Sequence, residues 1–177
     1  GYNLRFLKSL QYFNKILSES IVGEVFSVRC ETGYFLPEWR PDSDYRETVS
    51  ALSDLGGGVL FELSHEIDYL RWIFGEVAWV QAVLSHQSNL EINVEDCAHL
   101  ILGFTPSKNE KNLIATVNLD FIRHDNTRLC EVIGEKGTLR WNGITGEVSI
   151  YKSTSKDWQA LCHLDQQSDD SYIDEWK

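Results

Sequence analysis

The segment LGGGVLFELSHEIDYLRW (Leu55–Trp72) decides the fold of this chain, because a glycine triplet stands directly before an amphipathic helix. The apolar side chains that recur there at helical spacing are Leu60, Leu63, Ile67, Leu70 and Phe74. This single stripe predicts a helix from about Val59 to Phe74 with one buried face. Gly75 follows at the position where a glycine commonly ends a helix.

The opposite side of this helix carries residues capable of chemistry, namely Glu62, His65, Tyr69 and Trp72. A carboxylate and an imidazole one turn apart can form an acid/base pair, in which the carboxylate fixes the imidazole tautomer. The glycines upstream let the backbone approach closely at the helix N-terminus, where amide dipoles favour an anion. Glu62 and His65 are therefore our candidate catalytic residues. The alternative is a core histidine with a satisfied hydrogen bond beside glutamates on the helix surface.

Two other interpretations of the segment are disfavoured. Glu62-x-x-His65 is also the helical half-site of di-iron bundles, but such a site needs a second copy and two further helical glutamates. The chain has no second copy, so we expect no metal. The glycines also do not match the Gly-x-Gly-x-x-Gly fingerprint of dinucleotide-binding domains, which occurs nowhere in the chain.

The flanking sequence indicates one α+β domain. An apolar stripe predicts a helix from Phe6 to Ser20, and alternation predicts a strand over Glu24–Glu31. Further strands are expected at 77–87, 97–104, 113–122, 127–134, 137–142 and 147–151. Two early helices followed by consecutive strands predict an open-faced, mainly antiparallel sheet with helices packed on one face. Residues 1–177 form the single domain, with a peripheral polar tail over about 153–177 that closes in a short helix near 171–177.

Composition excludes several classes of protein. The chain has 177 residues, of which 42% are hydrophobic, and 16 Lys and Arg against 27 Asp and Glu give a net charge of −11. An acidic surface repels phosphate backbones and lipid headgroups, so we expect neither a nucleic-acid nor a membrane partner. The four cysteines form no Cys-x-x-Cys pair, which favours reduced thiols in a cytoplasmic protein. Because the chain begins with Gly1 and contains no methionine, we expect it to be part of a longer polypeptide.

Four segments occur in an order typical of one family. They are the opening Gly1–Phe6, the loop 34–46, the helix 55–72 and the hairpin Gly134-Glu-Lys-Gly-Thr-Leu139. Over roughly the first 150 residues the chain resembles the C-terminal domain of the glucose-fructose oxidoreductase, inositol dehydrogenase and rhizopine-catabolism (Gfo/Idh/MocA) oxidoreductases. The glycine-to-histidine helix is the most specific part of this resemblance.

The resemblance implies a two-domain enzyme that oxidises a secondary alcohol of a sugar, a sugar derivative or a cyclitol. An N-terminal Rossmann domain, absent from this chain, would bind NAD or NADP. This domain would contact the substrate and form a homo-oligomer through its open sheet face, and the isolated fragment would be inactive. A rival interpretation, from the polar residues on the strands, is a non-catalytic interaction module that binds a partner through the same face.

The resemblance also implies roles for individual residues. His65 matches the family's catalytic histidine, whereas Glu62 stands where relatives often carry Asp, at a spacing of three rather than four. The family's Glu-Lys-Pro lysine has no counterpart in this chain and would belong to the Rossmann domain. The expected substrate contacts are Tyr34, Trp39, Arg40, Tyr45 and Arg46. Asn3 and Arg5 are possible residues of the cleft that faces the cofactor.

Overall fold

The computed structural model describes residues 1–105, 112–164 and 168–176. These residues form an eight-stranded sheet in the order β2-β3-β4-β1-β5-β6-β7-β8. The strands are β1 (Val25–Gly33), β2 (Val77–Ser85), β3 (Cys97–Phe104), β4 (Ile114–Asp120), β5 (Thr127–Gly134), β6 (Gly137–Asn142), β7 (Glu147–Lys152) and β8 (Asp157–His163). Only the central β1–β4 pair is parallel within this described sheet. The predicted fold class, an open-faced and mainly antiparallel α+β sheet, is confirmed.

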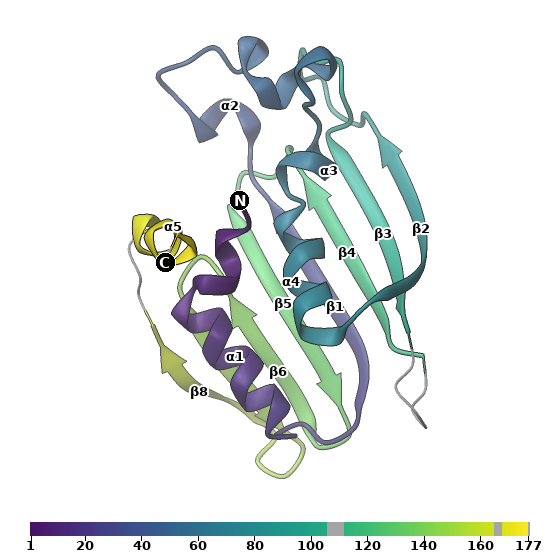
Figure 1. Cartoon of the computed structure of the whole chain (residues 1–177), viewed down its shortest axis with the longest axis vertical. Coiled ribbons are helices and arrows are strands. Elements are labelled where there is room, and N and C mark those ends of the chain that lie inside the picture. Colours follow the sequence, from purple (N-terminus) through teal and green to yellow (C-terminus); the bar gives the residue numbers. More distant parts are fainter. Residues whose placement is uncertain (106–111, 165–167, 177) are drawn as a thin grey trace.

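The described helices are η1 (Asn3–Phe6), α1 (Lys8–Ser18), α2 (Leu36–Trp39), η2 (Tyr45–Glu47), η3 (Val49–Ala51), η4 (Ser53–Leu55), α3 (Val59–Glu62), α4 (His65–Phe74) and α5 (Ser168–Glu175). The two longest, α1 and α4, lie on one face of the sheet, and α2 lies beyond the strand ends (Figure 1). Helices α1 and α4 cover the strands, and α5 packs beside η1 near the N-terminus. None of the described helices combines the length and apolarity needed to cross a bilayer.

Alternating strand residues and the helix stripes build the core between these layers. Trp141 on β6 is fully buried, and its indole N–H donates to Ser9 Oγ of α1 at 3.0 Å. Tyr69 of α4 meets the Trp141 ring edge-on, with centroids 5.5 Å apart, and its hydroxyl lies 3.0 Å from Cys30 Sγ. All four cysteines are free. Tyr69 is therefore a core residue. The prediction that it lies with Glu62 and His65, opposite the buried face of the helix, is wrong.

The predicted helix 59–74 is interrupted. Helix α3 ends at Glu62 and α4 begins at His65. Between them the Ser64 hydroxyl donates to the carbonyl of Phe61 at 2.8 Å, a local bond by which serine competes with regular helix geometry. Glu62 and His65 therefore belong to two separate helices that meet at this break.

The predicted tail also needs correction. Residues 157–163 form strand β8, which pairs with β7 at the sheet edge. Downstream of it, α5 returns to the N-terminus, where Ser171 Oγ accepts a hydrogen bond from Asn3 Nδ2 at 2.8 Å. The segment after residue 153 thus extends the sheet and packs on the start of the chain, although its composition had indicated a peripheral tail.

Candidate active site

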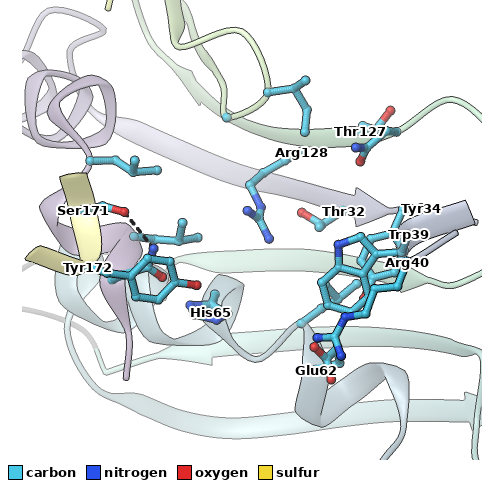
Figure 2. Close-up of a pocket in the computed structure, with 17 residues that line it drawn as sticks. Thr32, Tyr34, Trp39, Arg40, Glu62, His65, Thr127, Arg128, Ser171 and Tyr172 are labelled. Atoms are coloured by element: carbon cyan, nitrogen blue, oxygen red, sulfur yellow. Dashed lines mark hydrogen bonds between the residues drawn. The ribbon is translucent and has the colours of Figure 1, made fainter. Parts of the chain in front are cut away.

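A cavity of about 560 Å³ opens where η1, α2, α5, the α3–α4 break and the ends of β1 and β5 converge (Figure 2). Six of the predicted site residues line it: Asn3, Tyr34, Trp39, Arg40, Glu62 and His65. Helix α5 contributes Ser171 and Tyr172 to the wall. Residues from both ends of the described chain therefore meet around one hollow.

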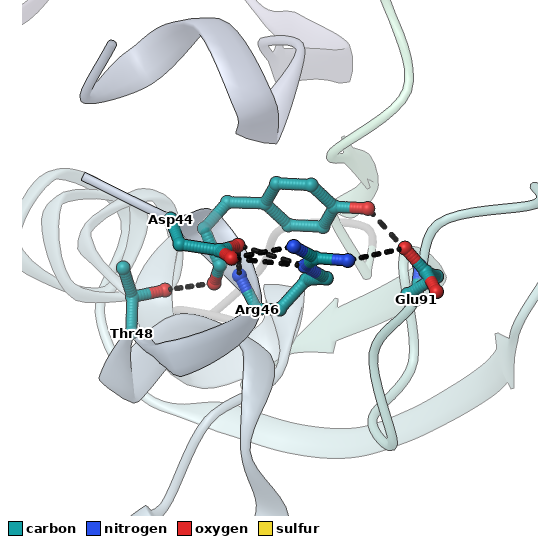
Figure 3. A network of polar contacts seen from close by, with 5 residues as sticks. Asp44, Arg46, Thr48 and Glu91 are labelled. Atoms are coloured by element: carbon teal, nitrogen blue, oxygen red, sulfur yellow. Dashed lines mark hydrogen bonds and ion pairs between the residues drawn. The ribbon is translucent and has the colours of Figure 1, made fainter. Parts of the chain in front are cut away.

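Three predicted residues lie outside this cavity. Arg5 is held by Asp68, with its Nε 2.7 Å from one carboxylate oxygen and Nη2 2.6 Å from the other. Arg46 is shared between Asp44 and Glu91, at 2.6 and 3.0 Å (Figure 3). Tyr45 belongs to the same network, because its hydroxyl accepts from the Glu91 amide at 3.3 Å. Arg5 thus links η1 to α4, and Arg46 and Tyr45 tie the loop to the segment around Glu91.

His65 supplies the imidazole of the site. Its ring meets Tyr2 edge-on with centroids 5.5 Å apart, and its Nδ1 is buried without a hydrogen-bond partner among the described residues. Burial lowers the pKa of His65 below its ordinary value, and the positive charge of Arg128 acts in the same direction. The imidazole is therefore neutral at neutral pH and able to accept a proton.

Glu62 does not form the expected direct pair with that imidazole nitrogen. Its Oε2 instead accepts a hydrogen bond from Ser50 Oγ at 3.0 Å. The helix break separates the two side chains along the cavity wall, as Figure 2 shows. Glu62 remains at the cavity as an acceptor, but it does not fix the tautomer of His65 through Nδ1.

The glycine triplet is structural. Gly57 and Gly58 donate their amides to the carbonyls of Leu52 and Ser50, and the Leu60 amide donates to the Glu95 carboxylate. A Cβ on Gly57 would collide with the Val49 carbonyl. The amides that were expected to favour an anion therefore already donate hydrogen bonds to acceptors within the protein. Among the described residues, no group of three His, Cys, Asp or Glu side chains is placed to hold a metal.

The unpartnered buried polar atoms of the described chain gather at this one place. They are Thr32 Oγ1, Tyr34 Oη, His65 Nδ1 and Glu66 Oε2. The first three residues line the cavity, and Glu66 binds a residue that does. An unsatisfied buried polar group costs about 1–3 kcal/mol, and such groups are rare in folded proteins. Their concentration beside a hollow makes this part of the described chain the candidate site.

Sequence reasoning missed Arg128, which projects toward the middle of the cavity (Figure 2). Its Nε donates to Oε1 of the fully buried Glu66 at 2.8 Å. The sequence could have indicated its position, because side chains two residues apart in a strand share a face. Arg128 therefore points to the same side of β5 as the buried Cys130 and Val132. The alternative interpretation, in which Glu66 is a charge on the helix surface, is wrong for this residue, because Glu66 is fully buried beside Arg128.

The fold and the cavity define a class: an open-faced α+β domain with a partly polar cavity that a histidine side chain lines. Residues 10–140 match the sequence model described as the GFO/IDH/MocA C-terminal domain. This match covers more than half of the chain, so the chain belongs to that family of oxidoreductase domains.

Comparison with individual proteins agrees with this assignment. The chain is 26% identical over 151 residues to an uncharacterized oxidoreductase of Synechocystis sp., covering 78% of this chain and 38% of that protein. A levoglucosan dehydrogenase in complex with NADH and levoglucosan has the same fold, with a TM-score of 0.82, 18% identity and 99% of this chain covered. An inositol dehydrogenase homolog from Azotobacter vinelandii, complexed with NAD⁺, gives a TM-score of 0.70 at 15% identity over 91% of this chain. This chain spans 54% and 42% of those two structures.

Proposed function

We propose that this chain is the substrate-binding and oligomerisation domain of a cytoplasmic NAD(P)-dependent oxidoreductase that acts on a secondary alcohol of a sugar, sugar derivative or cyclitol. The observation that carries the proposal is the cavity where a neutral, unpartnered imidazole meets aromatic and forked polar groups. Family membership supports the reaction class. The levoglucosan dehydrogenase and the inositol dehydrogenase homolog that share its fold support the substrate class.

His65 would act as the proton acceptor. A general base must be unprotonated at working pH and within reach of the hydroxyl it deprotonates. His65 meets the first condition through its lowered pKa and the second through its place in the cavity wall. Bound NAD or NADP supplies the hydride acceptor. Glu62, held by Ser50, would accept a hydrogen bond from a second hydroxyl of the substrate.

The cofactor would be held mainly by another part of the polypeptide, an N-terminal Rossmann domain. This chain has no Gly-x-Gly-x-x-Gly segment, which is the cradle that a dinucleotide pyrophosphate requires. The buried unpartnered atoms suit a small polyhydroxylated molecule. We therefore assign Asn3 to the wall of the substrate cavity and assign no cofactor contact to Arg5, which Asp68 binds.

Cofactor reduction by the full-length polypeptide tests this function. We expect NADH or NADPH absorbance to rise when neutral sugars or cyclitols are added with NAD⁺ or NADP⁺. The isolated chain of residues 1–177 should show no reduction under the same conditions. Failure of a broad panel of such alcohols with both cofactors would refute the proposal and favour the non-catalytic interaction module.

Trp39 is expected to form the aromatic floor for the sugar. Its ring lies 4.4 Å from the Tyr34 ring, and the Arg40 guanidinium lies 4.9 Å from its centroid. Aromatic contacts of this kind contribute about 0.5–1.5 kcal/mol, so Trp39→Ala should raise the sugar KM about tenfold with a smaller change in kcat. Trp176→Ala is the matched control, because Trp176 is 88% exposed. An unchanged KM in Trp39→Ala would contradict the assignment.

We further propose that the open sheet face joins copies of this chain. Trp79 and Val83 on β2, Ile101 on β3 and Ile114 on β4 share the face opposite the helices by strand register. All four are partly or largely exposed, Val83 at 64%. Exposed apolar side chains that gather on one sheet face are typical of an interaction site.

Val83→Glu is therefore expected to shift the protein to a smaller oligomer in sedimentation velocity. Val80→Glu provides a control from the same strand, because Val80 is 55% exposed but points to the opposite face. If Val83→Glu leaves the sedimentation coefficient unchanged, the interface lies elsewhere.

A further inference from the structure

The buried pair of Glu66 and Arg128 lies directly behind the cavity wall. Glu66 follows His65 at the start of α4 and has no exposed surface. Its Oε1 accepts from Arg128 Nε at 2.8 Å, and its Oε2 has no partner in the described part of the chain. The carboxylate therefore engages the inner side of the guanidinium and leaves the two terminal amino groups unbonded to it.

Arg128 is held in one position by its surroundings. It stands directly opposite Thr32 in the β1–β5 register, so both side chains leave the sheet on the cavity side. Its stem packs over Gly143, where an added Cβ would lie 2.7 Å from Arg128 Cδ. The Arg128 side chain is 22% exposed, and its guanidinium lies in the cavity between His65 and Trp39 (Figure 2). A guanidinium fixed in this way presents two parallel N–H donors, a geometry that matches two neighbouring oxygens.

The charges that the described residues bring to the cavity cancel. Among those residues, the charged side chains that line it are Arg40, Glu62 and Arg128. Arg40 and Glu62 have opposite signs, and Glu66 neutralises Arg128 from behind. A ligand carboxylate that entered would lose its hydration without gaining an uncompensated positive charge, which is unfavourable in a partly buried site.

We propose that the Glu66–Arg128 pair sets the charge selectivity of the cavity, so that Arg128 binds adjacent hydroxyl oxygens of an uncharged polyol and sugar acids are rejected. This inference rests on the proposed function, because it names the substrate class of the same site. Glu66 is a positioning residue in this scheme: it touches Arg128 and not the ligand. Its carboxylate both orients the guanidinium and removes its attraction for anions.

Titration calorimetry on the full-length polypeptide, with and without NAD⁺, tests the proposal with matched probes. The probes are D-glucose against D-glucuronate and D-galactose against D-galacturonate. We expect the wild type to bind each neutral sugar about tenfold or more tightly than its acid. Glu66→Gln keeps an acceptor for Arg128 but removes the negative charge, and it should shift this ratio at least about tenfold toward the acid. Glu76→Gln, which alters an exposed pair with Arg71, is the control and should leave the ratio unchanged.

Circular dichroism will show whether Glu66→Gln folds. A second variant tests the proposal if it does not. Arg128→Lys keeps a positive charge for Glu66 but loses the forked donors, so it should weaken binding of the neutral sugars about tenfold. A wild type that prefers the acids, binds none of the probes, or loses no affinity in Arg128→Lys overturns the inference. A folded Glu66→Gln with an unchanged ratio also overturns it. Loss of cofactor reduction with every alcohol would instead refute the proposed function, whatever the binding ratio.

Discussion

His65→Ala in the full-length polypeptide is expected to lower kcat by about 10²–10⁴, the range that a positioned general base contributes. The imidazole lines the cavity, and its buried Nδ1 has no hydrogen-bond partner among the described residues. Its pKa is lowered, so in the proposed reaction it takes the proton of the substrate hydroxyl. Stopped-flow or steady-state absorbance of the reduced cofactor measures this loss. KM for the sugar should change much less, because binding depends mainly on Trp39 and Arg128.

The pH dependence gives an independent readout of the same role. Burial and the charge of Arg128 lower the pKa of His65 below 6.5, so the base form dominates at neutral pH. The rate should fall only as the pH drops below that ordinary value, and this acid limb should disappear in His65→Ala. His163→Ala, which alters an exposed residue of β8, should retain both the rate and the limb. A near-normal rate in His65→Ala would assign the proton transfer to a group outside this chain.

Local periodicity was sufficient to predict much of the fold. Strands β3, β5 and β6 have the bounds that the sequence predicted, and buried residues alternate along part of each strand. Helical spacing also predicted the apolar stripe of α4, and the glycine predicted where that helix ends. Gly75 indeed has a φ of 91°, a conformation that favours glycine. Helical spacing also predicted His65 as a site residue, whereas Trp39 and Arg40 were predicted after the resemblance was identified; all three line the cavity.

The parts that sequence reasoning missed depend on contacts between distant segments. Strand β8 has exposed polar residues because it lies at the sheet edge, and therefore it resembles a tail in composition. The Glu66–Arg128 bond joins residues 62 positions apart, and no local pattern distinguishes this glutamate from a solvated one. Arg46 had the chemistry of a ligand contact, but Asp44 and Glu91 already use its donors. Residue type predicted what each group could do, whereas tertiary structure decided which groups were free to do it.

Arg128→Met should give the largest loss of stability. Methionine keeps most of the length of the side chain but leaves the Glu66 carboxylate buried without its partner. Removing one member of a buried ion pair costs about 3–5 kcal/mol, because the remaining charge is uncompensated. Urea unfolding at pH 7, followed by circular dichroism, measures this loss. Arg71→Met is the matched control, since its pair with Glu76 is exposed and such pairs contribute about 0–1 kcal/mol.

The loss should shrink as the pH falls, and the sign follows from Glu66. Burial raises the pKa of Glu66 above its ordinary value of 4.5, while Arg128 opposes that rise. Without Arg128 the pKa of Glu66 in the folded state rises further above its pKa in the unfolded state. The folded state therefore loses stability as the pH rises from the unfolded-state pKa towards the folded-state pKa. Below 4.5 both states hold the proton and the penalty vanishes, which should bring variant and wild type closer near pH 4. The same argument predicts that Glu66→Leu combined with Arg128→Met recovers most of the loss at pH 7, because no buried charge remains. A constant difference between pH 4 and pH 7 would mean that Arg128 stabilises the fold through its packed stem and not through its charge.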